Sequence, residues 1–326
     1  MARAIVGNEF GPPEVYKIEE YEPKAPGKGE VRVAIRAIGV SYVDVLTALG
    51  KYQVTPPLPF IPGSECAGVV EEVGEGVLHL KPGDAVMGSS FGGIFATEGT
   101  FRAGSFNKVP ETLTLEEAAV FPPSYLTSCH ALTDRGRLQP GETLLVLGAA
   151  GATGIAAIQI GKALGAKVIA SASSQEKRDL CLANGADAAV NTRSETWRDE
   201  VKAANGGKPV DVVFDPVGGD MTDPAFRSLG YDGRYLVIGF TGGISTLKTN
   251  LPLVKTASMI GVQLRVFGME EPEKMAATQA RVIEMAGQGL LKPAIGKVYK
   301  FDDYVAAMND AFAGKTAGRI VMKVAD

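Results

Sequence analysis

One segment near the middle of the chain constrains the fold more than any other part. Residues 144–147 are apolar, residues 148–154 hold three glycines, and residues 155–160 are apolar apart from one glutamine. A buried strand, a glycine turn and a helix in direct succession place the free N–H groups and the partial positive charge of a helix N-terminus where they can receive phosphate oxygens. The segment therefore predicts a parallel α/β domain with a dinucleotide site.

The turn departs at one position from the usual dinucleotide fingerprint. That fingerprint has glycine where this chain has Ala149, so the pattern by itself could also be a tight turn without a ligand. The strand, the helix and the next strand nevertheless have the spacing of a dinucleotide unit. Gly151 would let the backbone approach a pyrophosphate, and Gly154 would let the helix pack closely on the strand. The residues expected to contact the cofactor here are Ala150, Gly151, Ala152, Thr153 and Gly154.

The regions around this turn differ in pattern. Strands are expected at residues 143–147, 167–170, 210–214 and 234–238, and helices at 154–164, 175–183 and 195–204. Such alternation is typical of a doubly wound parallel sheet covered on both faces. The first 120 residues instead have short strands broken by glycine and proline, and the last segment is mixed. The fold class is therefore α/β: a Rossmann-type domain, residues 124–263, inserted into a β-rich domain of residues 1–123 and 264–326.

Composition narrows the class of partner. The chain has 326 residues, 45% of them hydrophobic, and a net charge of −4. Without a basic run, neither nucleic acid nor an anionic membrane surface is an expected partner. No stretch approaches the roughly 20 apolar residues that span a bilayer, and the N-terminus lacks the pattern of a secretory signal. Three widely spaced cysteines suit a reducing compartment, so the cytoplasm is the expected location.

The end of the second predicted strand distinguishes between the two nicotinamide dinucleotides. An NAD site usually has an acidic residue about 20 residues after the glycines, bonded to the ribose hydroxyls. This chain instead has three serines followed by two cations, which are Ser171, Ser173, Ser174, Lys177 and Arg178. Hydroxyls and cations favour an additional phosphate, so NADPH is the expected cofactor. Ser173 with Glu176 also fits a helix capping box, and Arg178 could equally face solvent.

Residues suited to metal binding or to hydrolysis are scarce. The chain has two histidines, His79 and His130, and no Cys-x-x-Cys pair. Apart from Cys129 beside His130, neither histidine has a partner at ligand spacing, and adjacent residues rarely converge on one metal, so no metal site is expected. His130 fits a core or helix residue better than a general base. The absence of a Gly-x-Ser-x-Gly elbow argues against a serine hydrolase.

Several segments together resemble the medium-chain dehydrogenase/reductase superfamily. They are residues 61–70, 77–86, 211–219 and 318–321, in the order of the family and over nearly the whole chain. Residues 39–44, 50–52 and 125–127 resemble more specifically its quinone oxidoreductase, or zeta-crystallin-like, branch. The resemblance implies that the β-rich domain is GroES-like and that the chain acts on a small molecule.

The same resemblance bears on zinc. Zinc-dependent members have cysteine at the position of Ser41, histidine at that of Ser64 and another cysteine near Pro123. All three are replaced in this chain, and the four-cysteine lobe of those members is missing. The family pattern therefore implies an enzyme that works without zinc.

For this branch the implied reaction is hydride transfer from NADPH to a quinone or a similar conjugated carbonyl compound. Negative charge then develops on the acceptor oxygen and needs a donor. Tyr52 is the leading candidate, because related enoyl reductases use tyrosine in the same Gly-x-Tyr setting, although it could instead only pack on the nicotinamide. Ser41 and Asp44 are further catalytic candidates. Relatives often have asparagine at Ser41, which alters one hydrogen bond near the nicotinamide, and Asp44 could equally hold loop structure.

The resemblance and the strand order suggest further cofactor contacts. Thr127 would bond the nicotinamide carboxamide, or else be an ordinary helix residue. Gly239 and Phe240 follow a strand at the carboxyl edge of the sheet, where ligands bind. Thr192 stands where relatives often have tyrosine near the adenosine phosphate, and the neighbouring Arg193 could replace that contact.

Substrate contacts are assigned to Tyr42, Tyr52 and Arg265. Arg265 could meet an anionic group such as a CoA phosphate, or form an interdomain salt bridge. Reduction of an enoyl-CoA or a 2-alkenal is therefore an alternative activity. A non-catalytic role, as a crystallin-like or RNA-binding protein, is a further alternative; the acidic balance argues against RNA, and the retained cofactor turn argues against a purely structural role.

Self-association is also expected. Residues 239–263 hold apolar, strand-like pieces that could pair across a sheet edge between two subunits. Members of the family are commonly homo-oligomers, and a dimer is the expected assembly.

Overall fold

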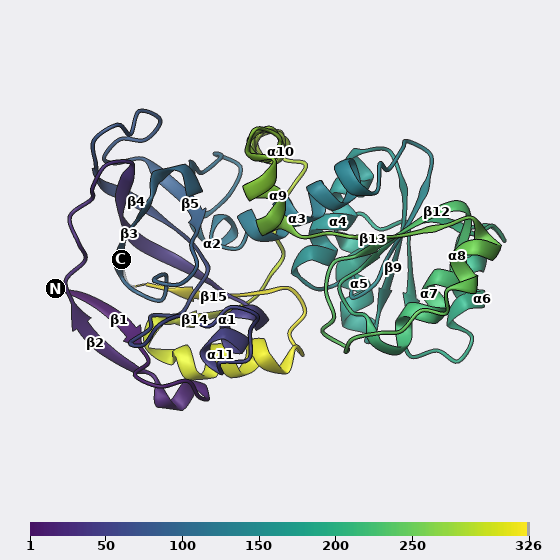
Figure 1. Ribbon diagram of the computed structural model, residues 1–326, viewed down its shortest axis with the longest axis horizontal. Helices are drawn as coiled ribbons and strands as arrows, with labels where there is room; N and C mark the ends of the chain where they lie inside the picture. Colours follow the sequence, from purple (N-terminus) through teal and green to yellow (C-terminus); the bar gives the residue numbers. More distant parts are fainter. Residues whose placement is uncertain (325–326) are drawn as a thin grey trace. The chain divides into compact units, whose positions relative to one another are not determined.

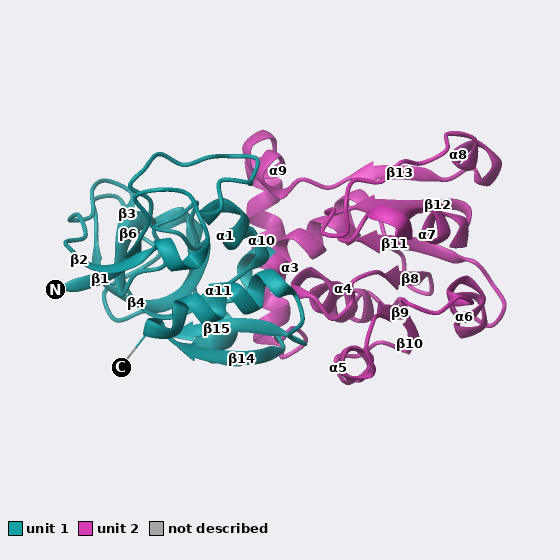
Figure 2. Cartoon of the chain, turned by 90° about the horizontal axis from the view of Figure 1, so that it is seen from below, with its two compact units in different colours: residues 1–123, 293–326 teal, residues 124–292 magenta. Residues whose placement is uncertain are grey.

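The computed structural model describes residues 1–324 and divides them into two compact units (Figures 1 and 2). Unit 1 comprises residues 1–123 together with the chain from residue 293 onward, and unit 2 comprises residues 124–292. The chain thus enters unit 2 once and leaves it once, so the α/β unit is an insertion into the β-rich one.

Unit 1 is organised by a seven-stranded sheet in the order β14-β15-β3-β4-β5-β7, with β6 pairing on β3; β1 and β2 form a separate hairpin-like pair. The strands are β1 (Ala2–Val6), β2 (Lys17–Tyr21), β3 (Glu30–Val40), β4 (Glu65–Val73), β5 (Ala85–Ser89), β6 (Glu98–Arg102), β7 (Phe106–Lys108), β14 (Ile295–Lys300) and β15 (Arg319–Lys323). Its helices include α1 (Tyr42–Ala48), α2 (Leu115–Ala118) and α11 (Tyr304–Ala313). Val33, Ile35 and Phe95 are fully buried in its apolar core.

Unit 2 contains a six-stranded parallel sheet in the order β10-β9-β8-β11-β12-β13. The strands are β8 (Thr143–Val146), β9 (Lys167–Ala172), β10 (Ala188–Asn191), β11 (Val210–Asp215), β12 (Leu229–Val237) and β13 (Ser258–Gly261). The order runs outward from β8 to β10 and then returns to β11 on the other side of β8. Ligands of such sheets bind beyond the carboxyl ends of the strands at this reversal.

The helices of unit 2 are α3 (Pro122–His130), α4 (Ala152–Ala163), α5 (Gln175–Ala183), α6 (Trp197–Ala204), α7 (Thr222–Ser228), α8 (Asn250–Lys255), α9 (Leu264–Glu270) and α10 (Pro272–Gly287). Five of them cover the two faces of the sheet. Figure 1 shows α4 and α5 on one side of the sheet and α6, α7 and α8 on the other. The apolar stretch predicted to start the first helix forms the buried side of α4, where residues 154–158 are all buried.

The predicted elements of the middle region are confirmed to within a few residues. The helix expected at residues 175–183 is α5 with the same bounds, and the strand expected at 234–238 is the second half of β12. Strand β10 was not predicted, because its four residues carry only a short apolar pattern. Of the strand-like pieces expected within residues 239–263, only residues 258–261 form a strand.

The boundary between the units differs from the sequence-based one at its second crossing. Residues 264–292, which were assigned to the first domain, belong to unit 2 as α9 and α10. Two contacts explain this. The ring of His130 on α3 stacks on Phe267 of α9, with 3.8 Å between ring centroids. Gln159 on α4 accepts a hydrogen bond from the Lys292 amide (2.9 Å) and donates one to its carbonyl (2.8 Å).

Candidate functional site

The glycine turn after β8 has the geometry of an anion-binding loop. Gly148 has a φ of 54°, and its carbonyl accepts a hydrogen bond from the Gly151 amide (2.9 Å). Gly151 is the N-cap of α4 and supplies no side-chain cap, so the helix begins without an internal acceptor for its first N–H groups. A helix start of this kind favours phosphate oxygens.

Gly154 and Ala149 explain how the turn packs. A Cβ added to Gly154 would lie 2.5 Å from the Ala149 carbonyl oxygen and 2.6 Å from that of Gly148, so α4 could not approach β8 as it does with any side chain at this position. Ala149 itself is fully buried, and its amide donates to the Ser171 carbonyl (3.2 Å). Alanine in place of the usual glycine at position 149 therefore puts a methyl group into the core. The exposed position 151 is still glycine and has no side chain.

A neighbouring helix fixes the position of α4. Ser128 on α3 donates a hydrogen bond to the Thr153 carbonyl (2.9 Å), and Tyr125 donates to Gln159 Oε1 (2.8 Å). Ala150 is buried, whereas Ala152 and Thr153 are half-buried beside Gly151. Thr127 lies on the same α3, half-buried, one residue from the Ser128 anchor.

Beside the glycine turn, the two loops that follow β11 and β12 also lie at the carboxyl end of the sheet. Asp215, at the end of β11, accepts hydrogen bonds from the Val217 amide (2.7 Å), the Gly218 amide (2.9 Å) and the Tyr235 hydroxyl. The Gly219 amide donates to the Gly243 carbonyl (2.8 Å), which ties the loops together. Burial beside Asp215 raises the pKa of Tyr235, so its hydroxyl stays a donor.

The loop that follows β12 contains two residues predicted to contact the cofactor, Gly239 and Phe240. Gly239 is half-buried and Phe240 is 52% exposed. The sequence analysis did not predict a role for Asp215, although this residue lies within the family-like segment 211–219. A buried acid directly before a pair of glycines is the signal that could have identified it as the residue that shapes this loop.

The three serines at and after the end of β9 do not all serve the same purpose. The N-cap of α5 is Ser174, whose hydroxyl accepts from the Lys177 amide (3.3 Å). The capping box expected between Ser173 and Glu176 is therefore wrong by one residue, and Ser173 lies half-buried just before the helix. Ser171 points into the domain: it is fully buried, and its hydroxyl bonds to Trp197 and Thr192.

Of the two cations on α5, Arg178 has defined contacts. Its Nη1 donates to the Ala172 carbonyl (3.3 Å) and its Nη2 to Gln175 Oε1 (2.9 Å). The guanidinium is thus held against the end of β9 rather than extended along a solvated helix face. Lys177 is half-buried one residue earlier, next to the Ser174 cap.

His130 has a supporting role in unit 2. It is buried at the end of α3, and its Nδ1 lies 2.8 Å from Oδ2 of Asp134, which belongs to the five-residue π-helical turn that follows, residues 131–135. With its ring stacked on Phe267, it joins α3 to α9. Arg265, on α9, is exposed; its amide donates to Gln263 Oε1 (3.2 Å), and its Nη1 lies 3.7 Å from Met269 Sδ.

In unit 1, Ser41 and Asp44 form a capping box at the start of α1. The Ser41 amide and hydroxyl donate to Asp44 Oδ2 (2.8 and 2.6 Å), and the Asp44 amide donates to Ser41 Oγ (3.2 Å). Burial raises the pKa of Asp44, against the opposing effect of hydrogen bonds from Ser41 and Ser64. Both residues have a definite structural role in holding the helix start.

Two aromatic residues lie close to this helix start along the chain. Tyr42 stacks on Phe312 of α11 with 5.5 Å between ring centroids and an interplanar angle of 5°. Tyr52 is half-buried in the bend that follows α1.

A buried ion pair in unit 1 escaped the sequence analysis. Glu65 on β4 is 2% exposed and pairs with Arg319 on β15. Burial raises the pKa of Glu65 to about 7, with Arg319 acting in the opposite direction and Asp44 adding to the rise. A Cβ on Gly39, opposite on β3, would lie 2.6 Å from Glu65 Cγ, so this glycine makes room for the carboxylate. The signal was present as one acid within the apolar run 61–70.

The described part of the chain offers neither a metal cluster nor a membrane-spanning helix. Within residues 1–324, no group of three or more His, Cys, Asp or Glu side chains is arranged to hold a metal ion. None of the helices in that same range combines the length and the apolar character that crossing a bilayer requires.

Comparison with known proteins gives consistent matches over the whole chain. Residues 27–127 match the family model described as alcohol dehydrogenase GroES-like domain, and residues 152–280 match the one described as zinc-binding dehydrogenase. Quinone oxidoreductase-like protein 2 of Rattus norvegicus is 37% identical over 99% of this chain and 92% of its own length. Quinone oxidoreductase of the same organism is 34% identical over 99% and 98%.

Solved structures match equally widely. A probable oxidoreductase from Mycobacterium abscessus superposes with a TM-score of 0.89 at 33% identity, covering 99% of this chain and 100% of that one. Escherichia coli quinone oxidoreductase complexed with NADPH gives 0.88 at 28%, covering 98% and 99%. CurK enoyl reductase gives 0.89 at 26%, covering 99% of each chain.

Proposed function

The chain is an oxidoreductase that belongs to the quinone oxidoreductase branch of the medium-chain dehydrogenase/reductase superfamily, and we propose that it uses NADPH to reduce a quinone or a similar conjugated carbonyl compound. One observation carries the proposal: the start of α4 has no side-chain cap, and the neighbouring strand β9 is followed by two serines and then by two cations on α5, with no acid at the end of the strand. The fold shared with an NADPH-complexed quinone oxidoreductase supports it.

The residues of unit 2 fit this cofactor. Gly151 exposes backbone where a pyrophosphate would approach, and residues 150–154 would surround it. The adenosine 2′-phosphate would lie near Ser173, Ser174, Lys177, Arg178 and Thr192, because these donors and cations gather at the carboxyl ends of β9 and β10. Thr127 would hold the nicotinamide carboxamide, with Gly239 and Phe240 at the border.

NADPH, when bound, would supply a hydride, which is one proton together with two electrons. The acceptor oxygen then needs one proton to become neutral, and we assign its donation to Tyr52. We propose that Ser41 and Asp44 contribute by fixing the start of α1, the helix that begins with Tyr42, a proposed substrate contact. Arg265 is the residue suited to an anionic substrate group because its guanidinium is exposed.

We propose that the reaction proceeds without zinc. The support is that Ser41 and Ser64, which replace zinc ligands of related enzymes, have hydroxyls engaged with Asp44. The zinc-binding dehydrogenase match covers residues 152–280 and so includes neither of these positions. Turnover that persists after dialysis against a strong chelator is the expected result.

We propose a homodimer formed through the edge strand β13. Several large apolar side chains near this edge are exposed, namely Tyr231, Leu253, Val254 and Met259. Lys255 donates to the Leu229 carbonyl (2.6 Å), which brings the end of α8 next to the start of β12. An edge strand with exposed apolar neighbours favours pairing with a second copy. Sedimentation of wild type and Met259→Lys tests this; an unchanged dimer would reject β13 as the contact.

We also propose the cytoplasm as the location. Cys66, Cys129 and Cys181 are free and buried, which suits a reducing compartment.

The test of the activity is NADPH oxidation with two substrate panels, quinones and enoyl thioesters. The proposal expects turnover of quinones. Turnover confined to the enoyl thioesters would favour the alternative, carbon–carbon double-bond reduction, which the similarity to CurK enoyl reductase also suggests. For the Tyr52 role, Tyr52→Phe should lower kcat about a hundredfold. Full activity of this variant would leave Tyr52 only a packing role.

A further inference from the structure

Three side chains of unit 2 form a hydrogen-bonded chain whose purpose the proposed function leaves unexplained. The indole Nε1–H of Trp197 donates to Ser171 Oγ (2.9 Å), which lies 2.9 Å from Thr192 Oγ1. Trp197 begins α6, Ser171 belongs to β9, and Thr192 follows β10. Trp197 and Ser171 are both buried, whereas Thr192 is half-buried. The chain therefore runs from the core toward the surface.

The first of these hydrogen bonds has a fixed direction, and burial favours one direction for the second, in which either hydroxyl can donate. An indole N–H can only donate, so Ser171 Oγ is the acceptor in the first bond. The Ser171 hydroxyl is fully buried and needs an acceptor for its own proton. Within residues 1–324, Thr192 Oγ1 is the acceptor that the structure provides for it. Thr192 therefore receives a hydrogen bond from inside, and its own proton is directed away from Ser171.

The surroundings of Thr192 show what its proton could meet. The Thr192 amide donates to the Ala172 carbonyl (3.2 Å), and Arg178 Nη1 donates to that same oxygen (3.3 Å). The backbone of Thr192 and the guanidinium of Arg178 thus meet at one carbonyl oxygen at the end of β9. Donors and positive charge gathered in this way suit a group that only accepts hydrogen bonds and carries negative charge.

We propose that Trp197 is a positioning residue for NADPH selectivity: through Ser171 it sets the Thr192 hydroxyl as a donor toward the adenosine 2′-phosphate. A phosphate oxygen can only accept, so a hydroxyl with a fixed outward proton is already oriented for it. The ribose hydroxyl of NADH can donate or accept and gains little from this orientation. The inference rests on the proposed use of NADPH and adds the physical basis of its selectivity.

Equilibrium binding of NADPH and NADH tests the last member of the chain. Thr192→Val removes the hydroxyl at nearly constant volume and should weaken NADPH binding about tenfold, the effect of one hydrogen bond to a charged group. NADH binding should change little. Thr192→Ser keeps the hydroxyl and should retain most of the NADPH affinity. Trp197 is the single tryptophan of the chain, so its fluorescence gives a second readout of binding in these variants.

Trp197→Phe tests the first member, because it keeps an aromatic ring but removes the N–H. We expect about a fivefold loss of NADPH affinity by calorimetry, with NADH affinity retained, because the Thr192 proton can then turn toward Ser171. Ser171→Ala breaks the chain with a smaller change in volume and serves if Trp197→Phe does not fold. Val201→Ala, which truncates a buried side chain one turn further along α6, is the control for loosened packing.

The outcomes separate the possible failures. If Trp197→Phe and Ser171→Ala weaken NADPH and NADH equally, as Val201→Ala would, the chain is only structural and the inference is wrong. An unchanged ratio of the two affinities in Thr192→Val would also overturn it. If the wild-type protein fails to bind NADPH, the proposed function itself fails.

Discussion

The two ends of the parallel sheet in unit 2 differ in what their polar groups bind. At the amino end, which we call the closed end, charged side chains bind one another and the backbone of the loops. At the carboxyl end, which we call the open end, backbone N–H groups of the glycine turn and short hydroxyl side chains lie at the surface. The polar groups of the amino end therefore stabilise the fold, whereas those of the carboxyl end remain available as donors to a ligand.

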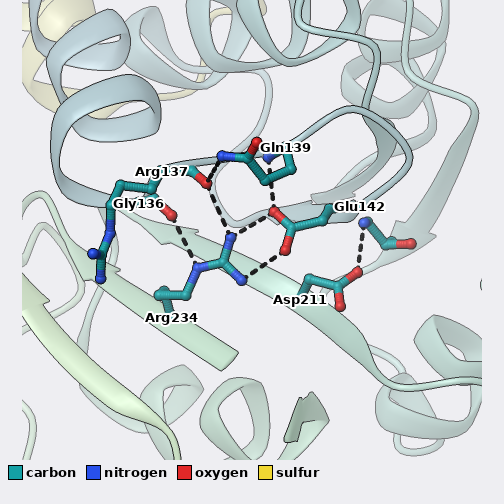
Figure 3. Close-up of polar contacts among 7 residues, drawn as sticks. Gly136, Arg137, Gln139, Glu142, Asp211 and Arg234 are labelled. Carbon is teal, nitrogen blue, oxygen red and sulfur yellow. Dashed lines mark hydrogen bonds and ion pairs between the residues drawn. The ribbon is translucent and has the colours of Figure 1, made fainter. Parts of the chain in front are cut away.

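Figure 3 shows the closed end. Arg234 on β12 forms a bidentate pair with Glu142 (Nη1–Oε1 2.8 Å, Nη2–Oε2 2.5 Å), and its Nε donates to the Gly136 carbonyl (2.9 Å). Asp211 Oδ2 accepts from the Thr143 amide (2.7 Å). The loop before β8 is therefore fixed to β11 and β12, and its polar groups are used within the protein.

The largest effect is expected at this closed end. Arg234→Ala should lower the free energy of unfolding by about 3 kcal/mol, because it leaves Glu142 largely buried without its cation. NADPH affinity of the folded variant should stay within about twofold of wild type, since the two ends are distant. Denaturant unfolding and calorimetry measure the two quantities. A cofactor defect as large as the loss of stability would contradict the separation of the ends.

The Arg234 effect should also depend on pH. Burial raises the pKa of Glu142, but hydrogen bonds from Arg234 and Gln139 outweigh it and hold the pKa below its usual 4.5. A lowered pKa means that the pair stabilises the fold above about pH 4.5 and loses this effect as the pH falls. The difference in stability between wild type and Arg234→Ala should therefore shrink in acid. A difference that stays constant down to pH 3 would show that lost packing, not charge, is the cause.

At the open end, Gly154→Ala should affect both stability and binding. The new Cβ would meet the Ala149 carbonyl oxygen at 2.5 Å, so α4 must shift away from β8, at a cost of about 2 kcal/mol. The same shift displaces the helix start that would receive the pyrophosphate, and NADPH affinity should fall at least about tenfold. The matched control is Gly287→Ala at the end of α10, where a Cβ meets nothing within 4 Å. If Gly154→Ala bound NADPH normally, the turn would not be the phosphate site.

Local patterns made the open end predictable. The strand, the glycine turn and the start of α4 lie within 20 consecutive residues, and the bounds of α5 follow from its own periodicity. The fold followed from repeating this local pattern along the chain, because parallel strands joined by helices have few possible arrangements.

Contacts between distant segments could not be predicted in the same way. In the sequence, Ser171 is one of three equivalent serines, and its inward hydrogen bond depends on Trp197, 26 residues later. The assignment of α9 and α10 to unit 2 depends on the stacking of His130 on Phe267, 137 residues apart. Periodicity within a segment carries no information on such partners, so the side-chain roles at β9 and the second unit boundary required the structure.

The smallest expected effect concerns Ser174, where stability and binding meet in one side chain. Ser174→Ala removes the N-cap of α5 and should cost about 1 kcal/mol of unfolding free energy. It also removes a hydroxyl near the proposed 2′-phosphate site, so NADPH affinity should fall about threefold while NADH affinity is kept. Thr114→Ala removes the N-cap of α2 in unit 1 at a similar cost in stability and should leave the ratio of the two affinities unchanged. If the two variants changed that ratio alike, Ser174 would act only as a helix cap. The preference for the 2′-phosphate would then come from Lys177, Arg178 and Thr192.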